Sequence, residues 1–359
     1  MNLLKILAFP VSLLYGSIIF LRNKLYDTGL LKSVKFNLPV ISIGNLSTGG
    51  TGKTPHIEYL IRLLKGKYTI ATLSRGYGRS SFGFLIATET SDTSQIGDEP
   101  RQFKNKFNDV IVAVDANRVR AVRKLLKQFP HIQTVLLDDA YQHRAITPGI
   151  SILLTDYNDM YYHDYILPTG SLREFRSGVK RADIIIVTKS PEILSPIEKR
   201  RIMKKINPET YQKVYFSYVH YGNFLPLGSK NHKALVSKEF YFERNYSIVL
   251  FTGIANGTYL EYYLKSKIEN LVVMRFADHH EYTADELIQV RKKWDSIKSE
   301  NKIILTTEKD AMRLAKESLI EVFKNIPLFY IPIEILFHDK EEERFHQQIF
   351  DYLRKSFIV

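Results

Sequence analysis

The chain contains no cysteine. Disulfide bonds, zinc sites built on thiolates and cysteine nucleophiles are therefore excluded. Low-complexity tracts and obvious internal repeats are also missing, and the apolar and charged fractions are those of a globular protein. With 359 residues, the chain is long enough for two domains that each bury a core of their own.

The chain has fewer acidic than basic residues. It contains 38 Asp and Glu and 51 Lys and Arg, which gives a formal net charge of +13. The basic residues are spread along the chain rather than gathered in one tail. This balance suits an acidic partner, such as a nucleotide, a nucleic acid, anionic lipid headgroups or a phosphorylated substrate. Charge alone does not choose among them.

The most informative stretch runs from Ile41 to Pro55, where an apolar run stops at a turn rich in Gly, Ser and Thr and a helical pattern follows. Strand, glycine loop and helix in this order predict a phosphate loop, whose backbone N–H groups and helix N-terminus attract phosphate. Lys53 would reach the β- and γ-phosphates and the Thr54 hydroxyl would bind Mg²⁺. The predicted nucleotide contacts are Ser47, Thr48, Gly49, Gly50, Thr51, Gly52, Lys53 and Thr54.

The alternative for this stretch is an ordinary strand-to-helix turn that is rich in glycine. The usual first glycine of the motif is indeed absent, because Ser47 stands in its place. Three glycines at positions 49, 50 and 52, followed directly by Lys-Thr, favour phosphate binding.

Apolar strand-like runs alternate with helical segments from residue 39 to about 190. This alternation predicts a parallel sheet with helices on both faces, and function is expected at the carboxyl ends of its strands. Polar residues do follow the runs, which are Val40–Ile43, Thr69–Leu73, Val110–Val114, Val135–Leu137, Ile150–Leu154 and Ile184–Val187.

Two groups of carboxylates in this region are candidates for chemistry. Asp138 and Asp139 end an apolar run in the Walker-B manner and would bind Mg²⁺ beside the phosphate loop. Strand-terminal Asp is common in loops, so this prediction depends on the Gly-Lys-Thr turn in the same sheet. Asp98 and Glu99 lie between Gly97 and Pro100, where Asp98 is either a helix N-cap, a functional carboxylate or both.

Residues 3–21 contain a single charge, Lys5, and are nearly long enough to span a bilayer. A signal peptide is disfavoured because Leu21 runs into Arg22 without a small-residue cleavage site. A buried core helix is a further alternative. We expect a membrane-associated helix, spanning or lying in the interface, within an N-terminal segment 1–36.

The predicted phosphate-loop domain then covers residues 37–220, and a smaller α/β domain with a closing helix covers residues 221–359. In the second domain, Asp278-His279-His280 follows a strand-like run. Metal binding is one interpretation, but neighbouring ligands rarely converge on one ion. A histidine that tunes a catalytic carboxylate is favoured. An aromatic and basic loop at 158–181 suits a sugar-phosphate site or a solvated surface equally well.

Several motifs together resemble one family, the tetraacyldisaccharide 4′-kinases of lipid A biosynthesis. They occur in the family's order across nearly the whole chain: Ile43 to Pro55, Ser74-Arg75-Gly76-Tyr77-Gly78, Gly97-Asp98-Glu99-Pro100, Asp138-Asp139-Ala140-Tyr141-Gln142-His143, Leu167-Pro168-Thr169-Gly170-Ser171-Leu172-Arg173-Glu174, Ala182-Asp183, Asp278-His279-His280 and Thr307-Glu308-Lys309-Asp310. Ala140, Thr169 and Ser171 depart from the family pattern, and none of these changes removes a charged group.

The resemblance implies ATP- and Mg²⁺-dependent phosphorylation of the 4′-hydroxyl of a tetraacylated glucosamine disaccharide 1-phosphate, at the cytoplasmic face of the bacterial inner membrane. Lys53 and Asp98 would be catalytic, with Asp98 as the base and either His279 or His280 as its partner. Thr54, Asp138 and Asp139 would bind the metal. Arg75, Arg173 and Glu174 are expected near the lipid substrate.

Two rival functions belong to other classes. A membrane-bound switch ATPase of the partition-protein type also uses a Gly-Gly-x-Gly-Lys-Thr loop, but that group carries a lysine where this chain has Thr48. A nucleic-acid-binding NTPase is suggested only by the net charge, and no RNA- or DNA-binding module is recognisable. We therefore expect a lipid substrate and the membrane surface as partners, without nucleic acid or an obligate protein partner.

Overall fold

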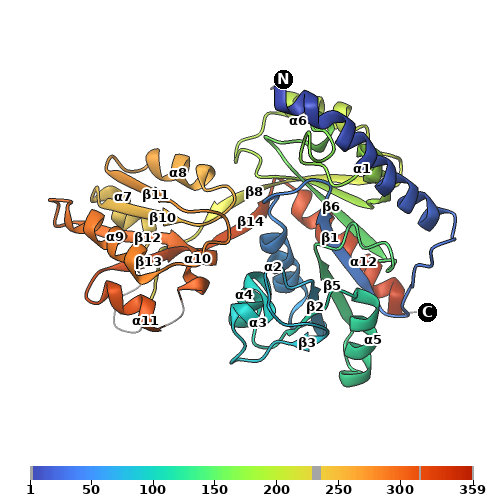
Figure 1. Ribbon diagram of the computed structural model, residues 1–359, viewed down its shortest axis with the longest axis horizontal. Coiled ribbons are helices and arrows are strands. Elements are labelled where there is room, and N and C mark those ends of the chain that lie inside the picture. Colours follow the sequence, from blue (N-terminus) through green and yellow to red (C-terminus); the bar gives the residue numbers. More distant parts are fainter. Residues whose placement is uncertain (1–2, 229–235, 315–316, 358–359) are drawn as a thin grey trace. The chain divides into compact units, whose positions relative to one another are not determined.

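The structure, a computed structural model, describes residues 3–228, 236–314 and 317–357. It divides into two compact units (Figure 1). The first unit comprises Met1–Val219 together with Ile335–Val359, and the second comprises His220–Glu334. The closing segment of the chain thus belongs to the first unit, and not to the C-terminal domain that the sequence predicted.

A long, mostly parallel sheet forms the centre of the first unit, with the strand order β14-β8-β7-β6-β1-β5-β2-β4-β3 in the described residues. The pairings from β8 to β4 are parallel, and β3 runs antiparallel to β4. The strands are β1 (Val40–Asn45), β2 (Ile70–Ser74), β3 (Leu85–Ile86), β4 (Ile111–Val114), β5 (Thr134–Asp138), β6 (Ile150–Asp156), β7 (Ile184–Thr188), β8 (Lys213–Tyr221) and β14 (Ile333–Phe337).

Helices cover both faces of this sheet, so its central strands are apolar on both sides. Ile41 and Ile43 face a core formed with α2 (Lys53–Leu64), α4 (Asp98–Lys106) and α12 (Glu341–Phe357). Val40 faces the opposite core, where α5 (Arg118–Gln128) packs. A third core is formed by residues of β6, β7 and α6 (Pro196–Ile206). The predicted α/β class, with helices on both faces of a parallel sheet, is confirmed.

Helix α1 (Leu3–Asp27) lies against the loop of residues 165–175 (Figure 1). Ser12 donates a hydrogen bond to the Thr169 hydroxyl (2.7 Å), and the Tyr15 hydroxyl donates to the Arg173 carbonyl (3.1 Å). The other side of the helix exposes a row of apolar residues: Leu7, Phe9, Val11, Leu13, Leu14, Ile18, Phe20 and Leu21. The helix is therefore not a buried core helix.

The sequence left open whether the N-terminal helix spans the membrane or lies in its interface. Across the described ranges, the structure contains no helix with the length and apolar character needed to cross a bilayer. Pro10 and the polar face formed by Ser12, Arg22 and Asn23 interrupt the apolar stretch.

The second unit is a smaller α/β domain with a sheet in the order β11-β10-β12-β13-β9. Its strands are β9 (Leu225–Pro226), β10 (Ser247–Thr252), β11 (Leu271–Arg275), β12 (Lys302–Thr307) and β13 (Leu328–Ile331). Helices α7 (Lys238–Glu243) and α8 (Thr258–Lys265) pack on one face, and α9 (Ala284–Asp295) on the other. Helix α10 (Glu308–Arg313) starts at the carboxyl end of β12.

The remaining elements of the described residues are short. Helices α3 (Thr93–Ile96) and α11 (Glu317–Ile320) have one turn each, and three 3₁₀ segments are η1 (Tyr161–His163), η2 (Arg176–Arg181) and η3 (Glu321–Phe323). The strands β3, β9 and β14 were not predicted from the sequence. The first two have only two residues, which is too short for an alternating pattern to be visible.

Candidate active site

The predicted phosphate loop lies between β1 and α2, at the carboxyl edge of the first sheet. Gly52 adopts a left-handed conformation (φ 89°) as the N-cap of α2, which an L side chain rarely tolerates. Lys53 and Thr54 are then the first two residues of the helix, so the helix N-terminus is directed at the loop. Thr54 is buried, whereas Gly49 and Gly50 are exposed.

The two halves of this loop have different hydrogen-bond partners. The first half pairs with the segment 171–173: the Thr48 N–H donates to the Ser171 carbonyl (2.7 Å), and Ser47 forms an isolated antiparallel β-bridge with Leu172. In the second half, the Thr51 carbonyl accepts a hydrogen bond from the Thr188 hydroxyl at the end of β7 (2.9 Å). The loop is therefore held from two neighbouring parts of the sheet edge.

Asp138 and Asp139 belong to the strand end next to the phosphate loop. Asp138 is the last residue of β5 and is opposite Ile43 of the adjacent strand β1, and Asp139 comes directly after it. Asp138 is buried at 5 % exposure. Asp139 has a left-handed backbone (φ 47°), and its carboxylate lies 3.8 Å from the Lys53 ammonium and accepts from the Arg173 guanidinium (3.0 Å). The structure thus brings together the lysine of the loop, the two carboxylates and one predicted substrate-binding arginine.

Arg118 of α5 lies beside this carboxylate pair, and its guanidinium donates a hydrogen bond to the Asp139 carbonyl (3.4 Å). Burial lowers the pKa of Arg118 to about 10, although the carboxylates of Asp139 and Asp138 oppose the shift. Burial also lowers the pKa of His143 to about 4, helped by the charges of Arg118, Arg22 and Arg75. His143 is therefore neutral at pH 7, and Arg118 stays charged.

Asp98 is the first residue of α4, and the N-cap is Gly97 (φ 91°). The sequence-based interpretation of Asp98 as the capping residue is therefore wrong. Gly97 packs against the loop after β2 so closely that an added Cβ would lie 2.9 Å from the Tyr77 carbonyl. Only glycine fits this approach, which places Asp98 beside the loop that carries the exposed Arg75.

Arg173 and Glu174 are neighbours in sequence but occupy different environments. Arg173 reaches the Asp139 carboxylate. Glu174 is 2 % exposed and accepts hydrogen bonds from Arg181 (2.7 Å), Asn23 of α1 (2.9 Å) and Gln142 (3.2 Å). Glu174 thus connects α1 to the body of the unit, whereas Arg173 belongs to the site itself.

In the second unit, the loops after β10 and β11 are tied together by Asp310 and Arg313 of α10. The Asp310 carboxylate is fully buried and accepts hydrogen bonds from the Gly253 N–H (3.1 Å) and from Arg313 (2.9 Å). Arg313 also donates to the Gly253 carbonyl (2.7 Å) and lies 3.3 Å from the His279 Nδ1. The sequence reasoning missed Arg313, which follows Thr307-Glu308-Lys309-Asp310 by one helical turn.

The two histidines of the Asp278-His279-His280 motif differ in their contacts. His280 Nε2 lies 3.0 Å from both oxygens of Glu286, the residue that completes the capping box of α9, and its ring stacks on Phe276. His279 has a left-handed backbone (φ 58°), and its ring faces Arg313. His280 is therefore part of a helix cap, and His279 is part of the polar cluster at the loop.

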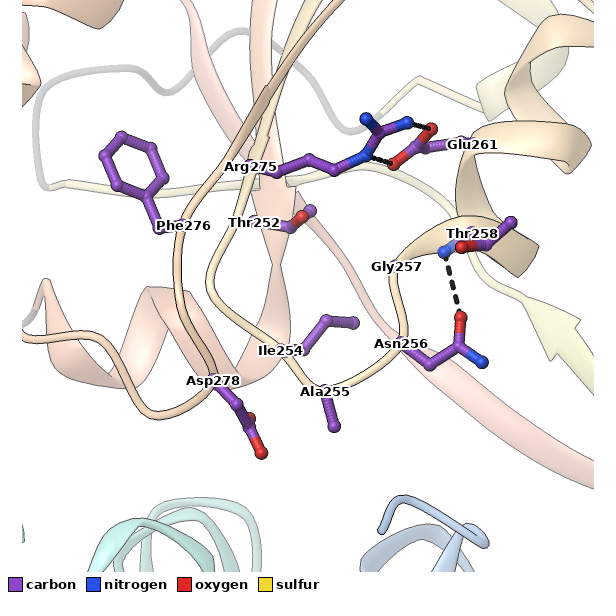
Figure 2. A pocket seen from close by; sticks show the side chains of 10 residues that line it. All are labelled: Thr252, Ile254, Ala255, Asn256, Gly257, Thr258, Glu261, Arg275, Phe276 and Asp278. Atoms are coloured by element: carbon purple, nitrogen blue, oxygen red, sulfur yellow. Dashed lines mark hydrogen bonds and ion pairs between the residues drawn. The ribbon is translucent and has the colours of Figure 1, made fainter. Parts of the chain in front are cut away.

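A pocket of about 230 Å³ opens beside this motif, at the carboxyl ends of β10 and β11 (Figure 2). Arg275 and Glu261 form a two-pronged ion pair on one side of it (2.7 and 2.5 Å), and Asp278 lies on the other. The lining residues come from the ends of β10 and β11, from the segments that follow these strands and from the start of α8.

The donor set at the first-unit edge fits a magnesium ion. Among the residues that the structure describes, no three His, Asp or Glu side chains gather into a group that would hold a metal by themselves. Mg²⁺ is commonly bound by one or two carboxylates, and the substrate phosphates and waters supply its other oxygen ligands. The Asp138 carboxylate at the end of β5 and the Thr54 hydroxyl in the first turn of α2 are oxygen donors of this type.

A parallel sheet with a Gly-Lys-Thr loop, a helix that starts at the lysine and a carboxylate on the adjacent strand define a phosphate-loop nucleotide-binding protein. Comparison with known proteins narrows this class. The family model "Tetraacyldisaccharide-1-P 4'-kinase" matches residues 4–354. The chain belongs to the tetraacyldisaccharide 4′-kinase family.

Individual relatives agree with this assignment over nearly the full length. The tetraacyldisaccharide 4′-kinase of Bacteroides thetaiotaomicron is 43% identical over 353 residues, which are 97% of this chain and 93% of that protein. The enzyme of the same name from Flavobacterium johnsoniae is 44% identical over 356 residues, 99% of each chain. A crystal structure of LpxK from Aquifex aeolicus in complex with ATP matches with a TM-score of 0.73 and 27% identity, covering 98% of this chain and 100% of that one.

The family assignment does not favour the rival switch ATPase of the partition-protein type.

Proposed function

We propose that the chain transfers the γ-phosphoryl group of ATP to the 4′-hydroxyl of a tetraacylated glucosamine disaccharide 1-phosphate. The observation that carries this proposal is the cluster of Lys53, Asp138, Asp139 and Arg173 around a phosphate loop, in a chain of this family. Phosphoryl transfer needs little covalent chemistry from the protein, because positioning and charge neutralisation account for most of the rate.

In this reaction the residues of the loop bind and orient the nucleotide. Lys53 leaves the Asp139 carboxylate, 3.8 Å away, and pairs with the β- and γ-phosphates. Thr54, Asp138 and Asp139 would hold Mg²⁺, which neutralises phosphate charge when it is bound. Arg173 and the exposed Arg75 supply further positive charge for the phosphorylated lipid.

Asp98 is the general base in this proposal. It is half-buried at the first position of α4, so its carboxylate is accessible at a rigid helix end. It accepts the proton of the attacking 4′-hydroxyl, a role that typically contributes about 10²–10⁴-fold in rate. Of the two motif histidines we assign the functional role to His279, because His280 is held by Glu286 in the cap of α9.

The exposed apolar row of α1 is proposed to contact the membrane surface that contains the lipid substrate. An amphipathic helix of this kind lies in the interface plane with its apolar face among the acyl chains. Its polar side is held to the protein by Ser12, Tyr15 and Asn23. The helix thereby brings the segment 165–175, including Arg173, next to the bilayer.

The transfer of label from γ-³²P-ATP to a tetraacyldisaccharide 1-phosphate in detergent micelles tests the proposed reaction. The wild-type protein should produce a labelled lipid, and Lys53→Ala and Asp98→Asn should each lower its rate by at least about 10²-fold. Lys127→Ala and Asp109→Asn remove exposed charges elsewhere in the first unit and serve as matched controls. A wild-type protein that hydrolyses ATP without labelling the lipid would refute the kinase proposal.

A further inference from the structure

His56 has no role in the reaction described so far, yet it is the only buried imidazole among the described residues that contacts the phosphate loop directly. It lies one turn into α2 and is 2 % exposed. Its Nδ1 is 2.7 Å from the Gly52 carbonyl oxygen, and its Nε2 is 3.1 Å from the Ser217 hydroxyl of β8.

The chemistry of these two partners determines the tautomer. A carbonyl oxygen only accepts hydrogen bonds, so the proton of the neutral ring is on Nδ1. Nε2 then accepts the hydroxyl proton of Ser217, which is itself fully buried in β8.

The Gly52 carbonyl matters because of the amide that follows it. A trans peptide is planar, and its C=O and N–H groups point in opposite directions. A donor that holds the Gly52 carbonyl therefore also sets the direction of the Lys53 N–H. The preceding peptide is controlled in the same way, because Thr188 holds the Thr51 carbonyl and so directs the Gly52 N–H.

We propose that His56 is a positioning residue for the nucleotide phosphates. The Gly52 carbonyl accepts two hydrogen bonds from His56, one from its backbone N–H (3.2 Å) and one from Nδ1–H. The ring donor adds to the first intrahelical bond in holding this carbonyl away from the loop mouth, which directs the Lys53 N–H toward the phosphate, while Ser217 keeps the ring in this tautomer and orientation. Glycine is favoured at position 52 by the left-handed backbone (φ 89°) and not by the ring, which would be in ordinary contact with an added Cβ (3.5 Å). The inference rests on the proposed use of ATP by the first unit.

Binding of ATP to the full-length protein, measured by titration calorimetry in the presence of Mg²⁺, tests this role. His56→Phe keeps the ring volume but has no donor, and we expect ATP affinity to fall about tenfold, which corresponds to about 1.4 kcal/mol. His56→Asn places an amide donor at the position of Nδ1 and should stay within about threefold of wild type. In the kinase assay, the KM for ATP should rise with His56→Phe while the KM for the lipid stays unchanged.

His346→Phe is the matched control, because His346 also contacts α2, through the Tyr59 hydroxyl, without touching the loop. If His56→Phe does not fold, His56→Leu replaces it, since leucine also has no donor and is smaller than the ring. The positioning role would be overturned if the folded donor-free variant bound ATP as tightly as the wild type. It would also be overturned if His56→Asn lost as much ATP affinity as the donor-free variant. Failure of the wild type to bind ATP would instead contradict the proposed function.

Discussion

At the residue scale, the Asp139 carboxylate lies between two cations that the nucleotide and the lipid are expected to use. Lys53 is 3.8 Å away and Arg173 3.0 Å away. All three side chains are partly exposed, so these pairs contribute little to stability and are readily exchanged. The carboxylate therefore keeps both cations at the site mouth until phosphate groups replace it.

The two motif histidines should separate into one functional and one structural residue. His279→Asn, which tolerates the left-handed backbone, should lower kcat about 10²-fold with little change in stability. His280→Asn should instead lower the unfolding temperature, because the Glu286 cap of α9 loses a partner. The measurement is kcat and thermal unfolding of both variants. A kcat loss with His280→Asn that exceeds the loss with His279→Asn would reverse the assignment.

Stability should fall as the pH decreases from about 6.5 to 4. The pKa of His56 and the pKa of His143 are both lowered to about 4 in the folded chain. Between pH 6.5 and 4 the unfolded chain therefore binds protons that the folded chain does not, so acid favours unfolding. For the fully buried His56 the loss is on the order of 3 kcal/mol.

Denaturant unfolding of the wild type and His56→Asn at pH 7 and pH 5 checks this expectation. The variant lacks one of the two groups, so its free energy of unfolding should decrease less over this range. An identical decrease in both proteins would show that His56 titrates normally in the folded state.

At the element scale, α1 combines two surfaces with different tasks. Gly16 allows its inner side to approach Phe175 and Ile166, where an added Cβ would lie 2.8–2.9 Å from these side chains. Its outer side exposes Leu14 at 65 % and Leu21 at 61 %. A helix that is held by one side and apolar on the other suits attachment to a membrane surface.

Removing apolar area from the outer side should weaken binding to lipid vesicles. Each leucine that enters the acyl region contributes about 1.5–3 kcal/mol. Leu14→Ser with Leu21→Ser should therefore lower the partition coefficient by at least about tenfold in co-sedimentation with anionic vesicles. Ile193→Ser with Ile197→Ser is the matched control, because both residues are exposed but lie outside α1. Equal effects of the two pairs would argue against α1 as the contact.

At the scale of the whole molecule, the chain returns to the first unit after forming the second. Helix α12 packs Phe345, Ile349 and Leu353 into the same core as α2 and the strands β1 and β6. The Tyr352 hydroxyl accepts a hydrogen bond from the Val40 N–H (3.0 Å), over 312 positions of sequence. The last helix therefore supports the strand from which the phosphate loop emerges.

A cavity in this distant helix should destabilise the first unit. Ile349 is fully buried, and Ile349→Ala should lower the free energy of unfolding by about 2–5 kcal/mol. Gln347→Ala, on the exposed side of α12, should change it by less than about 0.5 kcal/mol. Denaturant unfolding with and without ATP measures both, and a change below about 1 kcal/mol for Ile349→Ala would contradict the packing argument.

Local sequence was enough to predict the fold class and the position of the phosphate loop. Strands β1, β2 and β4 to β7 are continuous apolar runs because both faces of a parallel sheet are covered, and such runs are visible without any knowledge of contacts. The spacing of Gly49, Gly50, Gly52 and Lys53 is likewise local, since the backbone of the loop itself forms the phosphate cradle.

Other features depended on partners far away in the chain. Gly97 rather than Asp98 caps α4 because the loop after β2 passes within contact of it, and Glu174 is structural because α1 and Arg181 bind it. The same holds for His56, whose partner Ser217 is 161 residues away. Backbone propensity is a property of neighbouring residues, so the sequence by itself determined the strands, the helices and the glycine loop. The role of a polar side chain depends on which groups desolvate and bond it, and only the tertiary structure decided that.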